Sequence, residues 1–295
     1  MLIPLKFKDN VVSVVIATLG GQQLEKTVAA INAGSLVPSE ILICIPEEYS
    51  ESIIGIRYPN IRILKTHVKG QVAQRSEGFR QASRLLVLQL DDDIILHTDT
   101  LKKLVGCLIE LGLKNVIGPV FFEKGSDLPL SSFKVGLKGQ LISLYYFIFA
   151  GLPFGEARMG SMSRTCVTSS IDPRFFPSKT VLKTQWLPGG CVLNYREDLI
   201  VENFFKFDGK AYAEDVLHSY LRGKKGITHH VVIDAKASVD LPLNLFSIKD
   251  FIREMSIRVA IVQIMKGGLI RKSLYILTDA LRRILLCLRK KSDIC

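Results

Sequence analysis

The chain of 295 residues lacks several features that would assign it to familiar classes of protein. No apolar run reaches the roughly 18 to 20 residues that a membrane-spanning helix needs. The longest candidate, residues 141–153, fits a buried or interfacial helix better. The six cysteines include no C-x-x-C pair, and Cys44 and Cys107 lie inside apolar runs. A reduced, cytosolic setting is therefore expected.

Several nucleotide-binding and catalytic motifs are also missing. Residues 20–27 resemble a phosphate-binding loop, but Glu25 stands where that loop needs a glycine before its lysine. No G-x-G-x-x-G follows the first apolar run, and "GSMSRT" lacks the G-x-S-x-G spacing of hydrolases. His229 and His230 are adjacent and would face opposite sides of a strand. Basic and aromatic residues do not interleave on the predicted sheet, so we expect no nucleic-acid partner.

The charge of the chain is strongly positive, at +11 with a pI near 9.4. Such a charge suggests nucleic acid, anionic membranes or phosphate-bearing substrates as partners. Residues 246–295 hold eleven Lys or Arg against four Asp or Glu, a net charge of +7. The basic character is therefore mainly a property of the C-terminal segment.

The first half of the chain alternates predicted strands with predicted helices. Buried strands are expected at 11–18, 40–46, 61–66 and 85–90. Amphipathic helices are expected at 24–34, 71–82 and 100–113. This alternation favours parallel strands joined by crossover helices, and ligands of such sheets bind beyond the carboxyl ends of the strands.

The second half is less regular. A strand is expected at 115–122, and residues 124–185 show no clear pattern. A turn-containing stretch at 186–198, a helix at 211–226 and a strand at 229–239 follow. From residue 248 two helical apolar stripes appear, surrounded by Lys and Arg, which is typical of a membrane-surface or subunit-contact element. Their members are Ile248, Phe251, Ile252, Met255, Val259 and Val262, then Leu274, Leu277, Leu281, Leu285 and Leu288.

Three consecutive carboxylates, Asp91, Asp92 and Asp93, follow the buried run "LLVLQL". Side chains two residues apart at a strand end point roughly the same way, so Asp91 and Asp93 could share a divalent cation while Asp92 turns aside. A hard cation on oxygen ligands would offset the repulsion and attract a diphosphate. The alternative is a solvated acidic loop in which Asp93 caps the following helix.

Two further groups could carry chemistry. Glu214 and Asp215 fall at the start of a predicted helix, where a carboxylate could accept a proton from a hydroxyl as a general base. Plain helix capping is the alternative reading. Gly189 and Gly190 form a glycine pair that would let the backbone approach a ligand, or simply make a tight turn.

Taken in order, four segments resemble the inverting, GT-A-type glycosyltransferases known as family two. They are "VVSVVIATLGGQQLEKTVAAI", "GQVAQRSEGFRQASRLLVLQLDDDIIL", "WLPGGCVLNYRED" and "YAEDVLHSYLRGKKG". The resemblance implies a Rossmann-like, mixed but mostly parallel sheet flanked by helices. It covers most of residues 11–240, so we expect a glycosyltransferase domain at 1–245 and a basic amphipathic helical extension at 246–295.

The resemblance also implies roles for particular residues. Asp93 would lie nearest a Mn²⁺ or Mg²⁺ ion, with Asp91 toward the ribose and diphosphate of the donor. Asp215, next to Glu214, would deprotonate the acceptor hydroxyl, and the sugar would be transferred with inversion. The rest of the expected donor site is Thr18, Arg75, Asp92, Gly189 and Gly190.

Three departures from the family pattern are visible. Ile45 and Pro46 stand where an acidic residue usually contacts the base of the donor, and Glu47 follows late. Asp240 stands in place of a metal-binding histidine that many relatives have after the last strand. No Q-x-x-R-W follows Asp215 and no transmembrane bundle is present, which argues against a processive polysaccharide synthase.

The expected function is metal-dependent transfer of a sugar from a nucleotide-diphosphate donor to a glycan or lipid-linked acceptor, in polysaccharide or glycan synthesis. The expected location is cytoplasmic, with the C-terminal helices as a candidate contact to an anionic membrane on its inner face. The alternatives are a non-catalytic, membrane-associated module that binds nucleotide sugars and a haloacid dehalogenase-type phosphatase. That phosphatase family carries its D-x-D on the first strand, whereas several elements precede Asp91 here.

Overall fold

The computed structural model describes residues 11–53, 55–207, 209–240 and 247–292, with side chains described as far as residue 281. By its contacts the chain divides into two units. The first unit comprises Met1–Leu130 and Asp172–Leu241, and the second Ser131–Ile171 and Pro242–Cys295. The predicted boundary between 245 and 246 lies outside the described residues, so the division into domains at 1–245 and 246–295 is not tested and stays a prediction. The contacts group 131–171 with the C-terminal helices.

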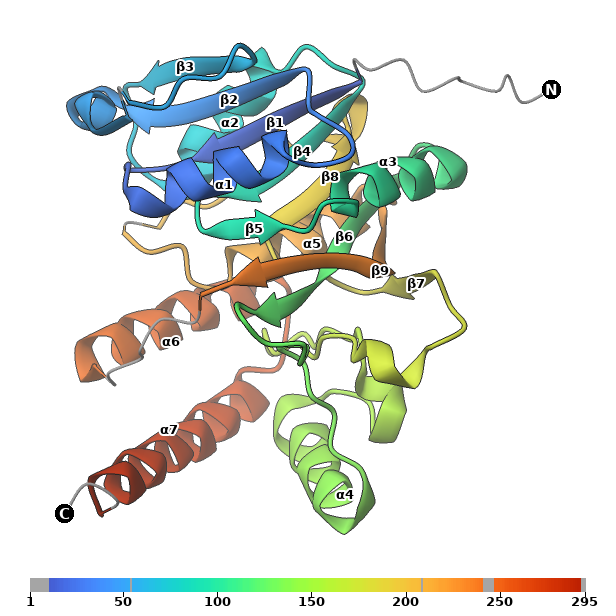
Figure 1. Cartoon of the computed structure of the whole chain (residues 1–295). Helices are drawn as coiled ribbons and strands as arrows, with labels where there is room; N and C mark the ends of the chain where they lie inside the picture. The colour runs from blue at the N-terminus through green and yellow to red at the C-terminus, as the bar shows by residue number, and fades with distance from the viewer. Residues whose placement is uncertain (1–10, 54, 208, 241–246, 293–295) are drawn as a thin grey trace. The chain divides into compact units, whose positions relative to one another are not determined.

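A mixed sheet of nine strands among the described residues forms the centre of the first unit (Figure 1). Its spatial order is β3-β2-β1-β4-β8-β6-β9-β5, and β7 pairs with β9 beside this path. The strands are β1 (Val12–Ala17), β2 (Glu40–Pro46), β3 (Ile61–Thr66), β4 (Leu86–Asp91), β5 (Ile94–Leu96), β6 (Asn115–Glu123), β7 (Val181–Thr184), β8 (Cys191–Tyr195) and β9 (Thr228–Val239).

The pairing directions change in the middle of the sheet. Strands β3, β2, β1 and β4 are parallel to one another. Strand β8 runs antiparallel to both β4 and β6, and β6 is parallel to β9 with a register shift between Pro119 and Val120. The expected mixed α/β fold is confirmed, and the bounds of the predicted strands at 40–46 and 61–66 agree with β2 and β3. Strand β2 is buried as expected, whereas the prediction of a buried strand at 61–66 is wrong, because β3 lies at the edge of the sheet and is largely exposed.

Helices cover both faces of this sheet, which explains its continuous apolar strands. They are α1 (Gln22–Asn32), α2 (Gln71–Gln81), α3 (Thr100–Leu111) and α5 (Glu214–Lys224), and short 3₁₀ turns occur at Glu47–Ile53, Pro173–Phe175 and Arg196–Asp198. Residues of β1 alternate between two cores: Val14 and Ile16 pack with residues of α1 and α3, and Val15 packs with Phe79 of α2. Strand β1 therefore has helices on both sides.

Helix α2 lies very close to the sheet because of a glycine. A Cβ atom added to Gly78 would collide with side-chain atoms of Val15 and Cys44. The glycine brings the polar residues of α2 near the carboxyl ends of β1 and β4, where the predicted site lies.

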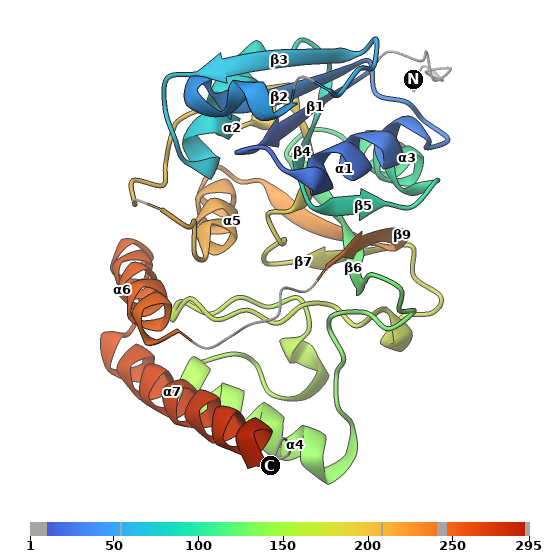
Figure 2. The same ribbon diagram turned by 60° about the vertical axis from the view of Figure 1, so that its left-hand side comes forward.

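The second unit is helical (Figure 2). It contains α4 (Gly136–Tyr145), a single π turn η2 (Tyr146–Ala150), a 3₁₀ turn η3 (Gly155–Arg158), α6 (Ile248–Ile264) and α7 (Leu269–Ser292). Its small core is formed by Ala150, Leu152 and Val167, with Tyr146 and Tyr275 packed against it. The predicted helix at 141–153 therefore corresponds to α4 and η2. Among the described helices, none is both long and apolar enough to cross a membrane.

We expect Gly78→Ala to lower the free energy of unfolding by about 1–3 kcal/mol, because the added methyl group overpacks the contact between α2 and the sheet. Urea denaturation would measure the change. Gly106→Ala is the matched control: Gly106 lies in α3 with open space around its Cα, so alanine should leave stability unchanged or raise it by about 0.5–1 kcal/mol. Equal effects of the two substitutions would contradict the close packing of α2.

Candidate functional site

The three aspartates lie at the carboxyl end of a central strand. Asp91 is the last residue of β4, which is buried up to Leu90, and Asp92 and Asp93 form the turn before β5. Because β1 and β4 are parallel and Asp91 is in register with Ala17, the carboxyl ends of both strands meet at one edge. The backbone N–H of Asp91 donates to the carbonyl of Gly190 at 2.8 Å. The triplet is thus held by β4 and by the glycine pair.

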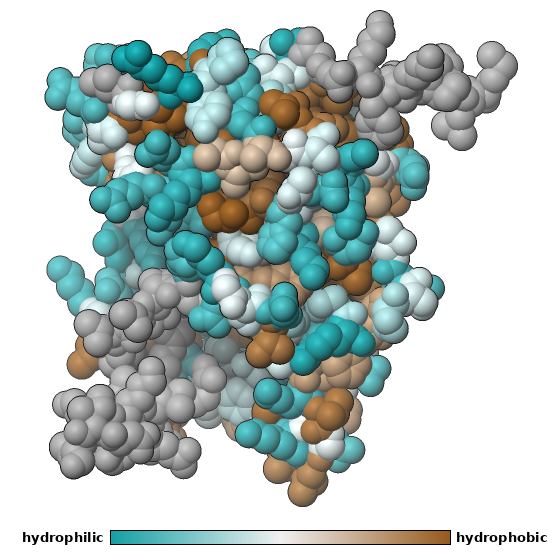
Figure 3. Space-filling model, viewed as in Figure 1, coloured by the Kyte–Doolittle hydropathy of each residue, from teal (hydrophilic) through white to brown (hydrophobic). Residues whose placement is uncertain are grey.

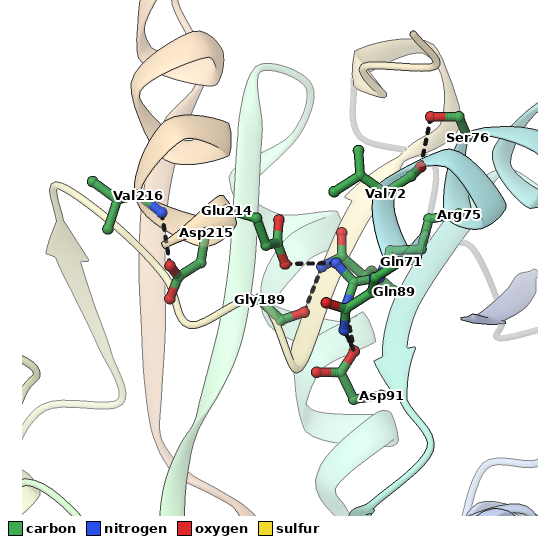
Figure 4. A network of polar contacts seen from close by, with 10 residues as sticks. All are labelled: Gln71, Val72, Arg75, Ser76, Gln89, Asp91, Gly189, Glu214, Asp215 and Val216. Carbon is green, nitrogen blue, oxygen red and sulfur yellow. Dashed lines mark hydrogen bonds and ion pairs between the residues drawn. The ribbon is translucent and has the colours of Figure 1, made fainter. Parts of the chain in front are cut away.

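The side chains of the triplet have different partners. Asp91 accepts hydrogen bonds from Arg75 and, at 3.1 Å, from Gln71 of α2 (Figure 4). Asp92 accepts from the hydroxyl of Thr18, while the backbone oxygen of Asp92 accepts from Thr27 at 2.9 Å. Asp93 is exposed. Asp92 therefore does turn aside from its neighbours, toward the end of β1.

Arg75 joins the two predicted acidic elements. Its guanidinium is 2% exposed, forms an ion pair with Asp91 and donates from Nη1 to Oε1 of Glu214 at 2.6 Å. Burial alone would lower the pKa of Arg75, but the carboxylates of Asp91 and Glu214 outweigh it and raise that pKa. We call this three-residue contact the Arg75 bridge. It connects α2, β4 and α5, which are separated by up to 139 positions in the sequence.

Helix α5 begins with the predicted carboxylate pair. Ala213, just before the helix, adopts a left-handed conformation with φ of 57°, which is unfavourable for a residue with a side chain. Glu214 is buried and turns toward Arg75, whereas Asp215 is partly exposed and points elsewhere, accepting from the N–H of Val216 at 2.9 Å (Figure 4). The two carboxylates thus occupy different environments although they are adjacent.

The glycine pair lies between the two acidic elements. A Cβ atom on Gly189 would collide with Oε1 of Glu214, and one on Gly190 would lie 3.4 Å from Oδ2 of Asp91. Neither glycine has a positive φ, so space rather than backbone freedom requires glycine at position 189. The amide of Gln89 also donates to the carbonyl of Gly189. The loop is therefore fixed against both carboxylates.

The carboxylates at this edge carry an excess of negative charge. Loss of surrounding water and the charge of Asp91 raise the pKa of Asp92, although the hydrogen bond from Thr18 lowers it. For Asp93, desolvation and the charges of Asp91 and Asp92 raise the pKa, with a further contribution from Asp240. Such an excess of oxygen charge is the environment that a hard divalent cation prefers.

The predicted metal ligands are near one another but are not assembled. Asp240 follows β9 and its carboxylate accepts from Lys124 at 3.0 Å and Gln23 at 3.2 Å. Among the described residues, no group of three His, Cys, Asp or Glu has the spacing needed to hold an ion. The donor set fits a cation in its chemistry, but Asp240 has a lysine as its present partner.

The sequence interpretation missed three glutamines of the site. Gln74 is 2% exposed and donates to the carbonyls of Thr18 and Cys44, both at 2.8 Å, which ties the ends of β1 and β2 together. Gln71 and Gln89 contact Asp91 and Gly189 as described above. A signal was present: positions 71, 74 and 75 form one polar helical stripe, and this stripe faces the sheet instead of water.

Behind the Arg75 bridge lie further buried basic residues. Arg222 of α5 donates to Oδ1 of Asn194 at 3.0 Å, and burial lowers its pKa to about 9. Burial and the charge of Arg222 lower the pKa of His218 well below its usual value, and burial lowers that of His229 to about 3. Burial thus favours the neutral form of both histidines.

Comparisons with known proteins agree with this architecture. Residues 45–155 match the model of a family described as glycosyl transferase family 2. A solved structure described as GalNAc-T7 with UDP, GalNAc and Mn²⁺ is similar, with a TM-score of 0.57 and 15% identity over 83% of this chain. The chain spans about half the length of that structure, covering 48% of it. The sequence matches none of the curated proteins.

The matched segment contains Arg75 and the aspartate triplet, while the glycine pair and Glu214–Asp215 lie downstream of it. At 15% identity the solved structure bears on the fold alone. Over residues 45–155 the chain is therefore similar to glycosyl transferase family 2, and its fold is of the GT-A type.

Proposed function

We propose that the chain transfers a sugar from a nucleotide-diphosphate donor to an acceptor hydroxyl with inversion at the anomeric carbon. The observation that carries this proposal is the Arg75 bridge, in which the buried guanidinium of Arg75 pairs with both Asp91 and Glu214. If the aspartates only formed an acidic loop and Glu214 only capped a helix, nothing would require the two elements to share one arginine. Their junction beside the glycine pair supports one site with a donor side and an acceptor side.

Asp215 is proposed as the general base. It lies beside the buried Glu214 at the first turn of α5 and is partly exposed, so its carboxylate can meet a hydroxyl group. The proposed step forms a bond from the acceptor oxygen to the anomeric carbon and breaks the bond from that carbon to the diphosphate. The hydroxyl proton passes to Asp215. Glu214 holds the start of the helix through Arg75.

Asp91 and Asp93, with Asp240, are proposed to hold a Mn²⁺ or Mg²⁺ ion. When bound, such an ion stabilises the negative charge of the departing diphosphate. Asp240 would have to leave Lys124 to become a ligand. Thr18 and Arg75 are buried by protein partners, so we propose that they shape the donor site through Asp92 and Asp91.

The remaining parts of the function are proposals as well. The solved structure named above contains UDP, which makes uridine nucleotides the first donors to test. A glycan or lipid-linked acceptor, a role in polysaccharide synthesis and a cytoplasmic location at the inner face of a membrane are proposed from the family resemblance and the basic C-terminal segment. The runner-up is a binding module without catalysis. A dehalogenase-type phosphatase is disfavoured because Asp91, its candidate nucleophile, is paired with Arg75.

Asp215→Asn should retain donor binding but lower transfer by about 10²- to 10⁴-fold, because the amide cannot accept the proton. Release of nucleoside diphosphate in the presence of acceptor would measure it. Asp234→Asn is the control, since Asp234 is an exposed carboxylate on β9 paired with Lys103. Full turnover by Asp215→Asn would refute the assigned base, and absence of turnover in the wild type with every donor bound would favour the binding module.

Nucleoside diphosphates with Mn²⁺ should raise the melting temperature of the wild-type protein, because a ligand that binds the folded state stabilises it. Asp93→Ala and chelation by EDTA should each abolish that rise. Asp99→Ala, which removes an exposed aspartate that makes no capping hydrogen bond, should preserve it. An undiminished rise in Asp93→Ala would show that Asp93 is not a metal ligand.

Arg75→Met should lower the free energy of unfolding by about 3–5 kcal/mol, because Asp91 and Glu214 lose the cation that compensates their burial. The double variant Arg75→Met/Glu214→Gln should recover part of that loss, since it removes one of the uncompensated charges. Urea denaturation of the two single variants and the double variant would give the coupling. Additive losses would show that Arg75 and Glu214 do not stabilise each other.

A further inference from the structure

Helix α7 of the second unit buries polar residues and exposes apolar ones, which is the opposite of what is expected for a helix at a surface in water. Lys272 and Asp279 are 0% and 2% exposed. Four apolar residues, by contrast, lie at intervals of four, three and four and are exposed: Ile270 at 81%, Leu274 at 47%, Leu277 at 68% and Leu281 at 58%. At 100° per residue this stripe lies opposite Lys272 and Asp279. A helix with water on its outer face would show the opposite pattern.

Helix α4 and the π turn η2 repeat this inversion. Gly139, Ser143 and Ala150 are buried. The same spacing of four, three and four gives an exposed stripe: Leu137 at 73%, Leu141 at 59%, Leu144 at 44% and Ile148 at 48%. In Figure 3 hydrophobic residues, shown in brown, lie on the surface in the region of α4. Small and polar residues therefore form the inner face of this helix too.

The two inverted helices contact each other. The ring of Tyr145 lies 6.3 Å from that of Tyr275, and the hydroxyl of Tyr145 is 2.8 Å from that of Thr278. We call the eight exposed residues, four on α4–η2 and four on α7, the outer leucine stripes. Soluble monomers rarely expose apolar groups so regularly, and such surfaces usually have a partner.

The charge of the second unit indicates which partner. It contains 15 Lys or Arg against 5 Asp or Glu, a net charge of +10, whereas the whole chain has +11. Two copies meeting through this unit would bring two strongly positive surfaces together. An anionic lipid surface would instead attract the unit and accept the leucine side chains, as for amphipathic helices that lie in the plane of a bilayer.

We propose that the second unit docks on an anionic phospholipid bilayer through the outer leucine stripes of α4–η2 and α7. The stripes enter the boundary between headgroups and acyl chains, and the excess positive charge holds the unit to the lipid phosphates. Helix α7 therefore supplies half of the contact, and residues 137–148 supply the other half. The proposal does not depend on glycosyl transfer.

The test is flotation of the full-length protein with vesicles of phosphatidylcholine alone or with phosphatidylglycerol, without donor or acceptor. The wild type should float with the anionic vesicles and lose binding at high salt, because salt screens the charges. Leu141→Ser/Leu277→Ser should weaken this binding by about tenfold or more. The control is Leu85→Ser/Leu113→Ser, which removes two leucines of the first unit that are 51% and 50% exposed.

Analytical ultracentrifugation of the same proteins tests whether a second copy of the chain covers the stripes instead of a bilayer. No binding of the wild type to anionic vesicles, or equal binding of both double variants, would overturn the proposal. A concentration-dependent dimer that Leu141→Ser/Leu277→Ser disrupts, without any vesicle binding, would assign the stripes to a second copy of the chain instead. Binding that is lost only in the stripe variant, with the melting temperature unchanged, would support the bilayer.

Discussion

The site depends on one buried cation shared by two carboxylates. Arg75 lies between Asp91 at the end of β4 and Glu214 at the start of α5, with 2% of its side chain exposed. Removing a carboxylate from water costs solvation free energy, and the positive charge of Arg75 offsets that cost for Asp91 and Glu214. Because the three residues come from three elements, the ion pairs fix the position of helix α5 relative to the sheet, and with it the direction of Asp215.

The architecture around this bridge follows from the two-sided sheet. Alternate residues of β1 face different cores, so helices pack on both sides and the apolar strands end together at one edge. Gly78 lets α2 approach the sheet closely, which brings Arg75 to the strand ends. The glycine pair leaves room between Asp91 and Glu214, because any side chain at Gly189 would occupy the space that Glu214 uses.

The second unit is stabilised differently. Helix α6 buries apolar residues, but the buried faces of α4 and α7 carry Gly, Ser, Lys and Asp, and the outer leucine stripes of α4–η2 and α7 are exposed. Helices α4 and α7 therefore leave apolar surface unburied in water. The first unit differs, because its apolar strands β1, β2, β4 and β8 are buried.

Much of the first unit could be predicted from the sequence because local patterns determine it. Continuous β-branched runs predicted β1, β2 and β3, and the position of the aspartates after a buried strand predicted the edge at which they lie. The sequence could not show that Arg75, which pairs with Asp91, also reaches Glu214, 139 positions further along the chain, because an ion pair between distant elements leaves no periodic signal. Nor could it show the outward direction of Leu277 or Leu141. An apolar stripe predicts a helix face, and only tertiary packing decides whether that face meets a core or is left exposed.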